Sequence, residues 1–124
     1  MALAMNNRKL KENVRRSAAL LIRKKGYISP VDMLMELDYL SLKDYEDWRK
    51  NKIPYLEKAC QTNLSKLSII MKELKQYATE NNLKSSWTAY HKWGKGPKVK
   101  LQFSKTGKEE IEKAYATHYV GLKK

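Results

Sequence analysis

Apolar residues at helical spacing predict that the chain opens with an amphipathic helix. The residues of this stripe are Leu10, Val14, Ala18 and Leu21. They place the helix over residues 7–25, and Gly26 supplies its C-terminal stop. At about 100° per residue, the arginines of this segment fall on the face opposite the stripe. We therefore expect one side of the helix to pack on a core and the other to present arginines.

Three capping signals predict a helical core over residues 29–82. Ser29 precedes a proline, and Ser41 is followed three residues later by a carboxylate, so each is typical of a helix start. Asn63 caps a third helix over residues 64–79. Its expected buried stripe consists of Leu64, Leu67, Ile70, Met71, Leu74, Tyr77 and Ala78. Asn81-Asn82 ends this helix, because asparagine tolerates the left-handed conformation.

The pattern then changes from a helical period to strict alternation. The alternating apolar positions are Trp87, Ala89, His91, Trp93, Val99, Leu101 and Phe103. Alternation on both sides of a Gly/Pro turn predicts a β-hairpin over residues 86–104. Matching the apolar faces sets Trp93 opposite Val99 and turns Tyr90 outward. A final helix is expected over residues 108–119, with His118 on its apolar stripe.

Together these elements predict one α+β domain that is mostly helical, with a single β-hairpin in its C-terminal half followed by a short helix. A length of 124 residues suits one domain, and 42% hydrophobic residues are too many for a disordered basic tail. The single cysteine, Cys60, excludes an internal disulfide framework. No apolar run has the length of a membrane span or a secretory signal. We therefore expect a cytoplasmic protein with no membrane partner, nucleoid-associated if it binds DNA.

Charge adds a functional prediction because it is segregated along the chain. The formal net charge is +13. Residues 1–28 carry eight basic residues and one acidic residue, and residues 84–108 carry seven lysines and no acidic residue. Segregation of this kind is typical of a phosphate-binding footprint. We expect the arginines of the first segment and the lysines of the second to converge on one cationic surface.

The hairpin register gives the lysines a specific arrangement. It sets Lys92 opposite Lys100, with Lys95 and Lys98 near the tip. Like charges opposite each other weaken a strand pair, and a bound phosphate backbone relieves that repulsion. The alternative is that the lysines keep an exposed strand edge from aggregating. Tyr90, on the lysine side, is the aromatic residue expected to contact bases.

The order of elements, several helices followed by a basic hairpin, resembles the winged-helix branch of the helix-turn-helix proteins. The resemblance covers roughly residues 29–107, with Ala59, Asn63 and Leu64 at the positions of the small residue, the turn residue and the apolar turn residue. It implies major-groove contacts from a recognition helix carrying Ser65, Lys66, Ser68 and Lys72. It also implies wing contacts to phosphate from Lys92, Lys95, Lys98 and Lys100. The first helix, with Arg8, Arg15, Arg16 and Arg23, is extra to that fold and is expected to flank the duplex or mediate a dimer.

Residues for catalysis or metal binding are few. His91 and His118 are the only histidines, and as a general acid–base pair they would suit a small nuclease. Each lies on an apolar stripe, which favours a packed imidazole instead. Cys60 and the two histidines lack the spacing of metal-ligand pairs. We expect neither a metal nor another cofactor.

The sequence thus predicts a non-enzymatic protein, compatible with a role in transcription regulation, whose partner is a nucleic acid. We expect duplex DNA, bound through the helix over residues 64–79 and the basic hairpin, mainly by phosphate contacts. One alternative is RNA. Another is a protein–protein adaptor that docks through its Tyr/Trp-rich middle, with Tyr39, Tyr45 and Trp48. A homodimer or a protein partner is compatible with either interpretation.

Overall fold

The first element of the structure is the helix that the apolar stripe predicts. The computed structural model describes residues 2–121, and α1 covers Ala2–Lys25. All four residues of the predicted stripe are buried. Gly26 ends the helix with a φ of 80°, in the left-handed region that favours glycine, and its N–H donates to the Ile22 carbonyl at 2.8 Å.

Serine hydroxyls begin the next two helices, as predicted. Ser29 caps α2 (Pro30–Glu36) and Ser41 caps α3 (Leu42–Arg49), each hydroxyl accepting a backbone N–H at 3.0 Å. Each bond satisfies an N–H group that has no partner within its helix. A single turn, α4 (Leu56–Ala59), follows.

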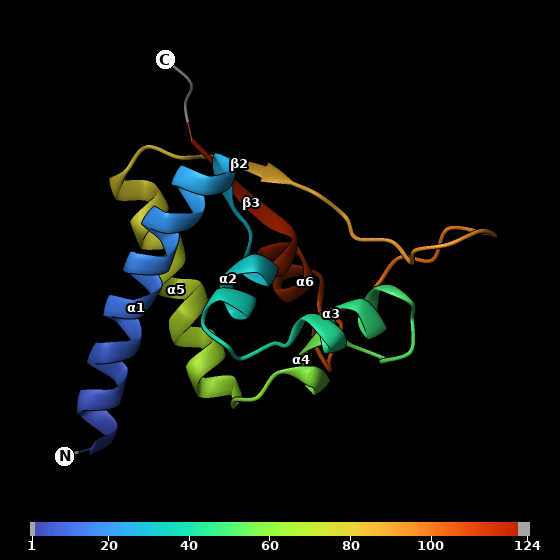
Figure 1. Ribbon diagram of the computed structural model, residues 1–124, viewed down its shortest axis with the longest axis horizontal. Helices are drawn as coiled ribbons and strands as arrows, with labels where there is room; N and C mark the ends of the chain where they lie inside the picture. The colour runs from blue at the N-terminus through green and yellow to red at the C-terminus, as the bar shows by residue number, and fades with distance from the viewer. Residues whose placement is uncertain (1, 122–124) are drawn as a thin grey trace.

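Helix α5 (Leu64–Glu80) packs against α1 (Figure 1). The Asn63 side chain caps its start by accepting the Lys66 N–H at 2.9 Å, and Asn82 follows its end with a φ of 56°. The buried residues of α5 are Leu67, Ile70, Glu73, Leu74 and Ala78. Leu64 departs from the prediction: it is 66% exposed and borders a groove beside α6.

A three-stranded antiparallel sheet joins distant parts of the chain. The strands β1 (Tyr27–Ile28), β3 (Thr117–Val120) and β2 (Lys84–Trp87) lie in the order β1-β3-β2. The predicted helix over residues 108–119 is therefore wrong at its end, because α6 covers only Glu109–Ala116 and a strand follows it. Residues 117–120 pair with β2, and Tyr119 and Val120 also pair with β1; this pairing outweighs the helical pattern of the local sequence.

The predicted hairpin over residues 86–104 forms only in part. Beyond β2 the structure has one isolated antiparallel bridge, between His91 and Lys100. This pairing is shifted by one residue from the predicted one, in which Lys100 faced Lys92. A one-residue shift exchanges the two faces of a strand. The predicted register is therefore wrong, and so are the outward position of Tyr90 and the inward positions of Trp87 and Trp93.

Trp48 occupies the centre of an aromatic core. Its side chain is fully buried, and its ring centroid lies 5.5 Å from that of Tyr90 and 5.2 Å from that of Phe103. The indole N–H donates to the carbonyl of Gln102 at 2.9 Å. Helix α3 is thus bound to the segment that precedes α6, and Trp48 has no exposed surface to offer a partner.

These elements confirm the predicted class, an α+β fold that is mostly helical. Within residues 2–121 there are six helices and the small antiparallel sheet. Across this described part of the chain, no helix combines the length and the apolarity needed to cross a membrane.

Candidate nucleic-acid interface

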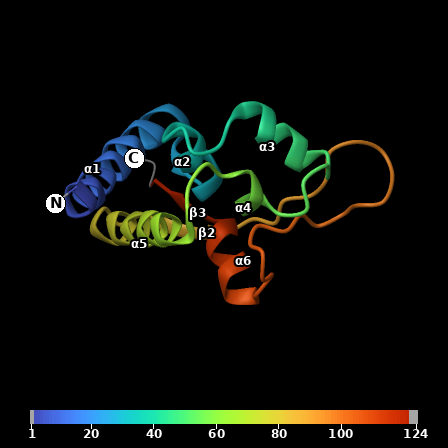
Figure 2. The ribbon, with the colours of Figure 1, turned by 90° about the horizontal axis from the view of Figure 1, so that it is seen from below.

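Four of the seven lysines of the second basic segment lie on a loop that projects from one end of the molecule (Figures 1 and 2). We call residues 91–100 the basic arm. Lys92, Lys95, Lys98 and Lys100 are all exposed on it. Two backbone hydrogen bonds close the arm, from Lys92 N to the Val99 carbonyl at 2.8 Å and from Leu101 N to the Tyr90 carbonyl at 2.9 Å. The arm therefore presents four cations on a projecting loop that is closed at its base.

Two glycines let the arm reverse direction at its tip. Gly94 and Gly96 have φ values of 109° and 106°, a conformation that residues with a side chain rarely adopt. A Cβ added at either would meet no atom within 4 Å, so the backbone conformation, and not lack of space, requires glycine. Pro97, which follows, limits the freedom of the returning strand.

Arg49, at the end of α3, anchors the base of the arm. Its guanidinium carbon lies 5.0 Å from the ring centroid of Trp93 and 5.1 Å from that of Tyr90. Its carbonyl accepts the Trp93 N–H at 2.7 Å. Stacking of this kind stabilises a partly buried cation. The sequence reasoning missed Arg49, because the contact depends on residues more than forty positions away; an arginine next to the buried Trp48 was the available signal.

Tyr90 is buried, with 9% of its surface exposed, so the prediction that it turns outward is wrong. Its hydroxyl lies 3.1 Å from Nε2 of His118, and its ring packs on Trp48 and Phe103. Burial raises the pKa of Tyr90. A buried tyrosine needs a partner for its hydroxyl, and only the inward direction brings His118 within reach.

Trp87 and Trp93, predicted to be core residues, are exposed instead, at 54% and 41%. The Lys100 ammonium lies 5.3 Å from the Trp87 ring centroid. An indole and a lysine therefore share the surface next to the basic arm.

Arg15 of α1 is used in contacts that hold α1 to α5. Its guanidinium donates to Glu73, which is 8% exposed, and to Glu80 at 2.8 Å, both on α5. These hydrogen bonds raise the pKa of Arg15, Glu80 contributing more than Glu73. A side chain bound to two carboxylates has little left to offer a phosphate, so Arg15 is a poor contact residue.

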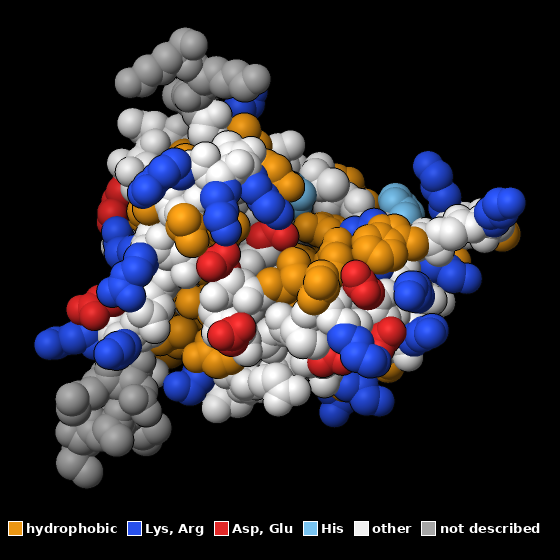
Figure 3. All heavy atoms as spheres, viewed as in Figure 1, with side chains coloured by type: hydrophobic (Ala, Val, Ile, Leu, Met, Phe, Trp, Pro, Cys, Tyr) orange, Lys and Arg blue, Asp and Glu red, His pale blue; other side chains and the backbone are white. Residues whose placement is uncertain are grey.

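The remaining arginines of the predicted footprint, Arg8, Arg16 and Arg23, are exposed on α1. Helix α1 and the basic arm lie at opposite ends of the long axis in both ribbon views (Figures 1 and 2). On the face drawn in Figure 3, acidic side chains lie between the two groups of cations. The expected single cationic surface is therefore wrong, and two separate basic regions take its place.

Helix α5 carries the residues assigned to a recognition helix. Ser65, Ser68 and Lys72 are exposed, and Lys66 is half-buried. Ser68 borders an apolar groove of about 350 Å³ between α5 and α6, in which Glu57 and Glu110 also take part. Carboxylates at this position would repel the phosphates that flank a DNA groove.

His118 is a packed residue, as its apolar position predicts. Its ring stacks on that of Tyr27 at 5.4 Å. Burial lowers the pKa of His118. Burial also raises the pKa of the Cys60 thiol to about 12, which keeps it protonated and makes it a poor metal ligand. Among residues 2–121 no group of three or more His, Cys, Asp or Glu side chains is arranged to hold a metal ion.

Acidification is expected to destabilise the protein through His118. The folded state binds the imidazole proton less tightly than the unfolded chain does, so protonation below the ordinary pKa of 6.5 favours unfolding. The urea midpoint, followed by circular dichroism, should fall as the pH drops below 6.5. The fall should be smaller in a His118→Phe variant and should persist in His91→Gln. An equal fall in His118→Phe would assign the effect to other groups.

Comparisons of the chain with protein-family models, with curated proteins and with solved structures find no match.

Proposed function

We propose that this protein binds duplex DNA through the basic arm, mainly by contacts to phosphate. The observation that carries the proposal is the projection of four exposed lysines on a segment that contains no acidic residue. Each lysine that replaces a condensed counterion on the DNA contributes affinity through ion release. Arg49 already holds the base of the arm in place, so less conformational entropy is lost when the arm is ordered on DNA.

The shape of the arm favours duplex DNA over duplex RNA. The major groove of B-DNA is about 12 Å wide and admits a two-stranded ribbon, whereas the major groove of A-form RNA is deep and too narrow for side chains to read. The arm is a projecting loop that one antiparallel bridge closes at its base, and a projection of this kind can enter the wider groove.

The winged-helix interpretation forms part of the same proposal, with the basic arm as the wing. A long helix, α5, followed by β2 and a projecting basic segment supports it. In this arrangement α6, with three glutamates in its first turn, lies between the arm and β3 along the chain. We place the main contacts on the arm and leave out the exposed face of α5, because carboxylates border it.

A mobility-shift series tests the proposal. Blunt duplex DNA, single-stranded DNA and an RNA duplex of equal length are compared over a range of salt concentrations. We expect duplex DNA to bind most tightly, with a slope of log affinity against log salt of about −3 to −4 if all four lysines contact phosphate. Affinity that does not change with salt, or a preference for the RNA duplex, would contradict the proposal.

The adaptor alternative keeps only part of its proposed docking surface. Trp48 is fully buried, and Tyr39 and Tyr45 are partly buried against the core. A partner protein that stays bound to this chain in high salt and after nuclease treatment would favour this alternative. Neither condition preserves a complex held together by phosphate contacts.

A further inference from the structure

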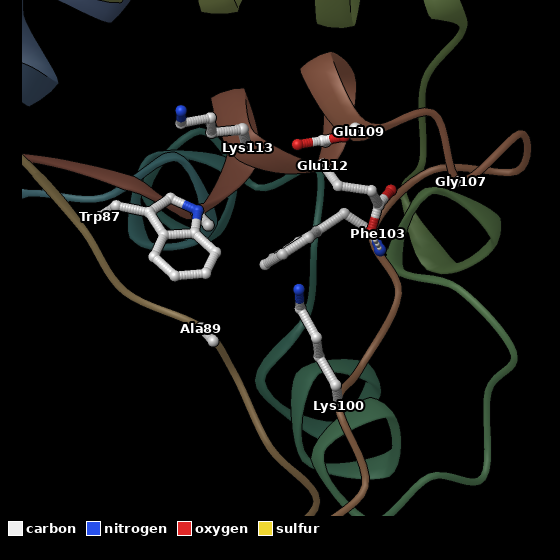
Figure 4. A pocket seen from close by; sticks show the side chains of 9 residues that line it. Trp87, Ala89, Lys100, Phe103, Gly107, Glu109, Glu112 and Lys113 are labelled. Atoms are coloured by element: carbon white, nitrogen blue, oxygen red, sulfur yellow. Dashed lines mark hydrogen bonds between the residues drawn. The ribbon is translucent and has the colours of Figure 1, made fainter.

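A cavity of about 440 Å³ lies beside the basic arm, between β2, the returning segment and α6 (Figure 4). Its apolar lining comes from Trp87, Ala89, Phe103 and Ala116. This volume is within the range of sites that hold small organic groups. The fold thus leaves an apolar space next to its most basic segment.

Trp87 forms one wall of the cavity and is free to stack. More than half of its surface is exposed, and the contact described above is with an ammonium, not with another ring. In Figure 4 its indole faces Phe103 and the end of Lys100 across the open space. An exposed indole is a platform on which any base can stack, since every base has a π-face.

The charges around the cavity suit a nucleotide. The Glu112 carboxylate is already used, because it accepts the backbone N–H groups of Phe103 at 2.8 Å and Ser104 at 2.7 Å. Lys100 and Lys113 remain at the cavity as cations, whereas the Glu109 carboxylate can accept a hydrogen bond from a base but would repel a phosphate placed next to it. An apolar slot with two lysines at its edge matches a flat base joined to anionic phosphates.

We infer that this cavity holds one unpaired base of the bound DNA, stacked on Trp87, while Lys100 and Lys113 meet the phosphates on either side of that base. The inference rests on the proposed function, since Lys100 belongs both to the basic arm and to the cavity. A strand overhang or an extruded base supplies the unpaired nucleotide. The Lys100 ammonium then exchanges its contact with the indole for one with phosphate.

Three DNA ligands separate base stacking from phosphate contact. They are a blunt duplex, the same duplex with a short thymidine overhang, and the same duplex with an abasic overhang of equal length. The two overhangs carry the same number of phosphates, so they differ only in the bases. We expect the thymidine overhang to bind about tenfold more tightly than the abasic one and to quench tryptophan fluorescence.

Variants of the cavity residues test whether the difference in affinity between the two overhangs depends on the cavity. In Trp87→Ala the two overhang duplexes should bind equally. In Ala89→Leu, which narrows the cavity and keeps the indole, the tenfold difference should shrink. Leu64→Ala, which removes an exposed apolar side chain on the opposite side of α6, should keep the tenfold difference. A wild-type protein that binds the blunt duplex without distinguishing the overhangs overturns the cavity inference and leaves the proposed function standing. A difference that persists in both cavity variants also overturns the inference, and failure to bind any of the duplexes overturns both proposals.

Discussion

Replacing the four lysines of the basic arm with alanine is expected to weaken binding to duplex DNA by about a thousandfold at moderate salt. The variant combines Lys92→Ala, Lys95→Ala, Lys98→Ala and Lys100→Ala. Each lost phosphate contact removes about one released counterion, so the slope of log affinity against log salt should also become shallower by about 3 to 4. Mobility shifts with blunt duplex DNA over a salt series measure both quantities.

Helix α1 offers a control with the same change in net charge. Alanine at Arg8, Arg16, Arg23 and Lys24 removes four exposed cations at the other end of the molecule and spares Arg15, which holds α5. If the arm makes the contacts, this second variant should lose far less affinity and keep most of the salt slope. Equal losses in the two variants would show that overall charge, and not the arm, governs binding.

Replacing Trp48 with alanine is expected to cost about 3–5 kcal/mol of unfolding free energy, a large part of the 5–15 kcal/mol typical of a domain. The side chain is fully buried between α3 and the segment that precedes α6, so its removal leaves a cavity in the aromatic core. Urea denaturation followed by circular dichroism gives the change in free energy.

Two further variants test whether the loss of stability in Trp48→Ala comes from the buried ring. Trp48→Phe should lose less, because the ring fills part of the space and the Gln102 carbonyl still accepts the Leu56 N–H at 3.1 Å. Leu42→Ala removes a side chain that is 64% exposed and should change stability by less than about 0.5 kcal/mol. If Trp48→Ala unfolds at the same urea concentration as Leu42→Ala, the indole is not the centre of the core.

The helix starts could be predicted from sequence because a cap is a local interaction. Ser29, Ser41 and Asn63 each bond to a backbone N–H three residues ahead, so the information lies within one turn. Gly26 and Asn82 likewise have positive φ values, which their residue types favour.

The inward and outward faces of the predicted hairpin could not be predicted in this way. Tyr90 turns inward because Trp48 and His118 lie where it arrives, and both are distant in sequence. Alternation alone allows two registers. Trp93 was expected to point inward because it is hydrophobic, but its indole can also lie at the surface when it packs on Arg49.

The residues of the candidate site could be predicted only where a local pattern in the sequence determines their exposure. Composition identified the lysines of the arm, since exposure is the usual state of a lysine in a segment without acidic residues. The partners of Arg15 lie 58 and 65 residues away, and no local pattern in the sequence indicates them. The separation of α1 from the arm is likewise a property of the tertiary structure.

The order of the sheet has a consequence for the folding of the nascent chain. The central strand, β3, comes last along the chain, and β1 and β2 each pair with it and not with one another. Until the ribosome has added Val120, both outer strands expose backbone groups that nothing in the sheet can satisfy. Helices α1 and α5 can associate during synthesis, but closure of the sheet is a late step of folding. Chains released early would therefore have unpaired strand edges, which chaperones and proteases recognise.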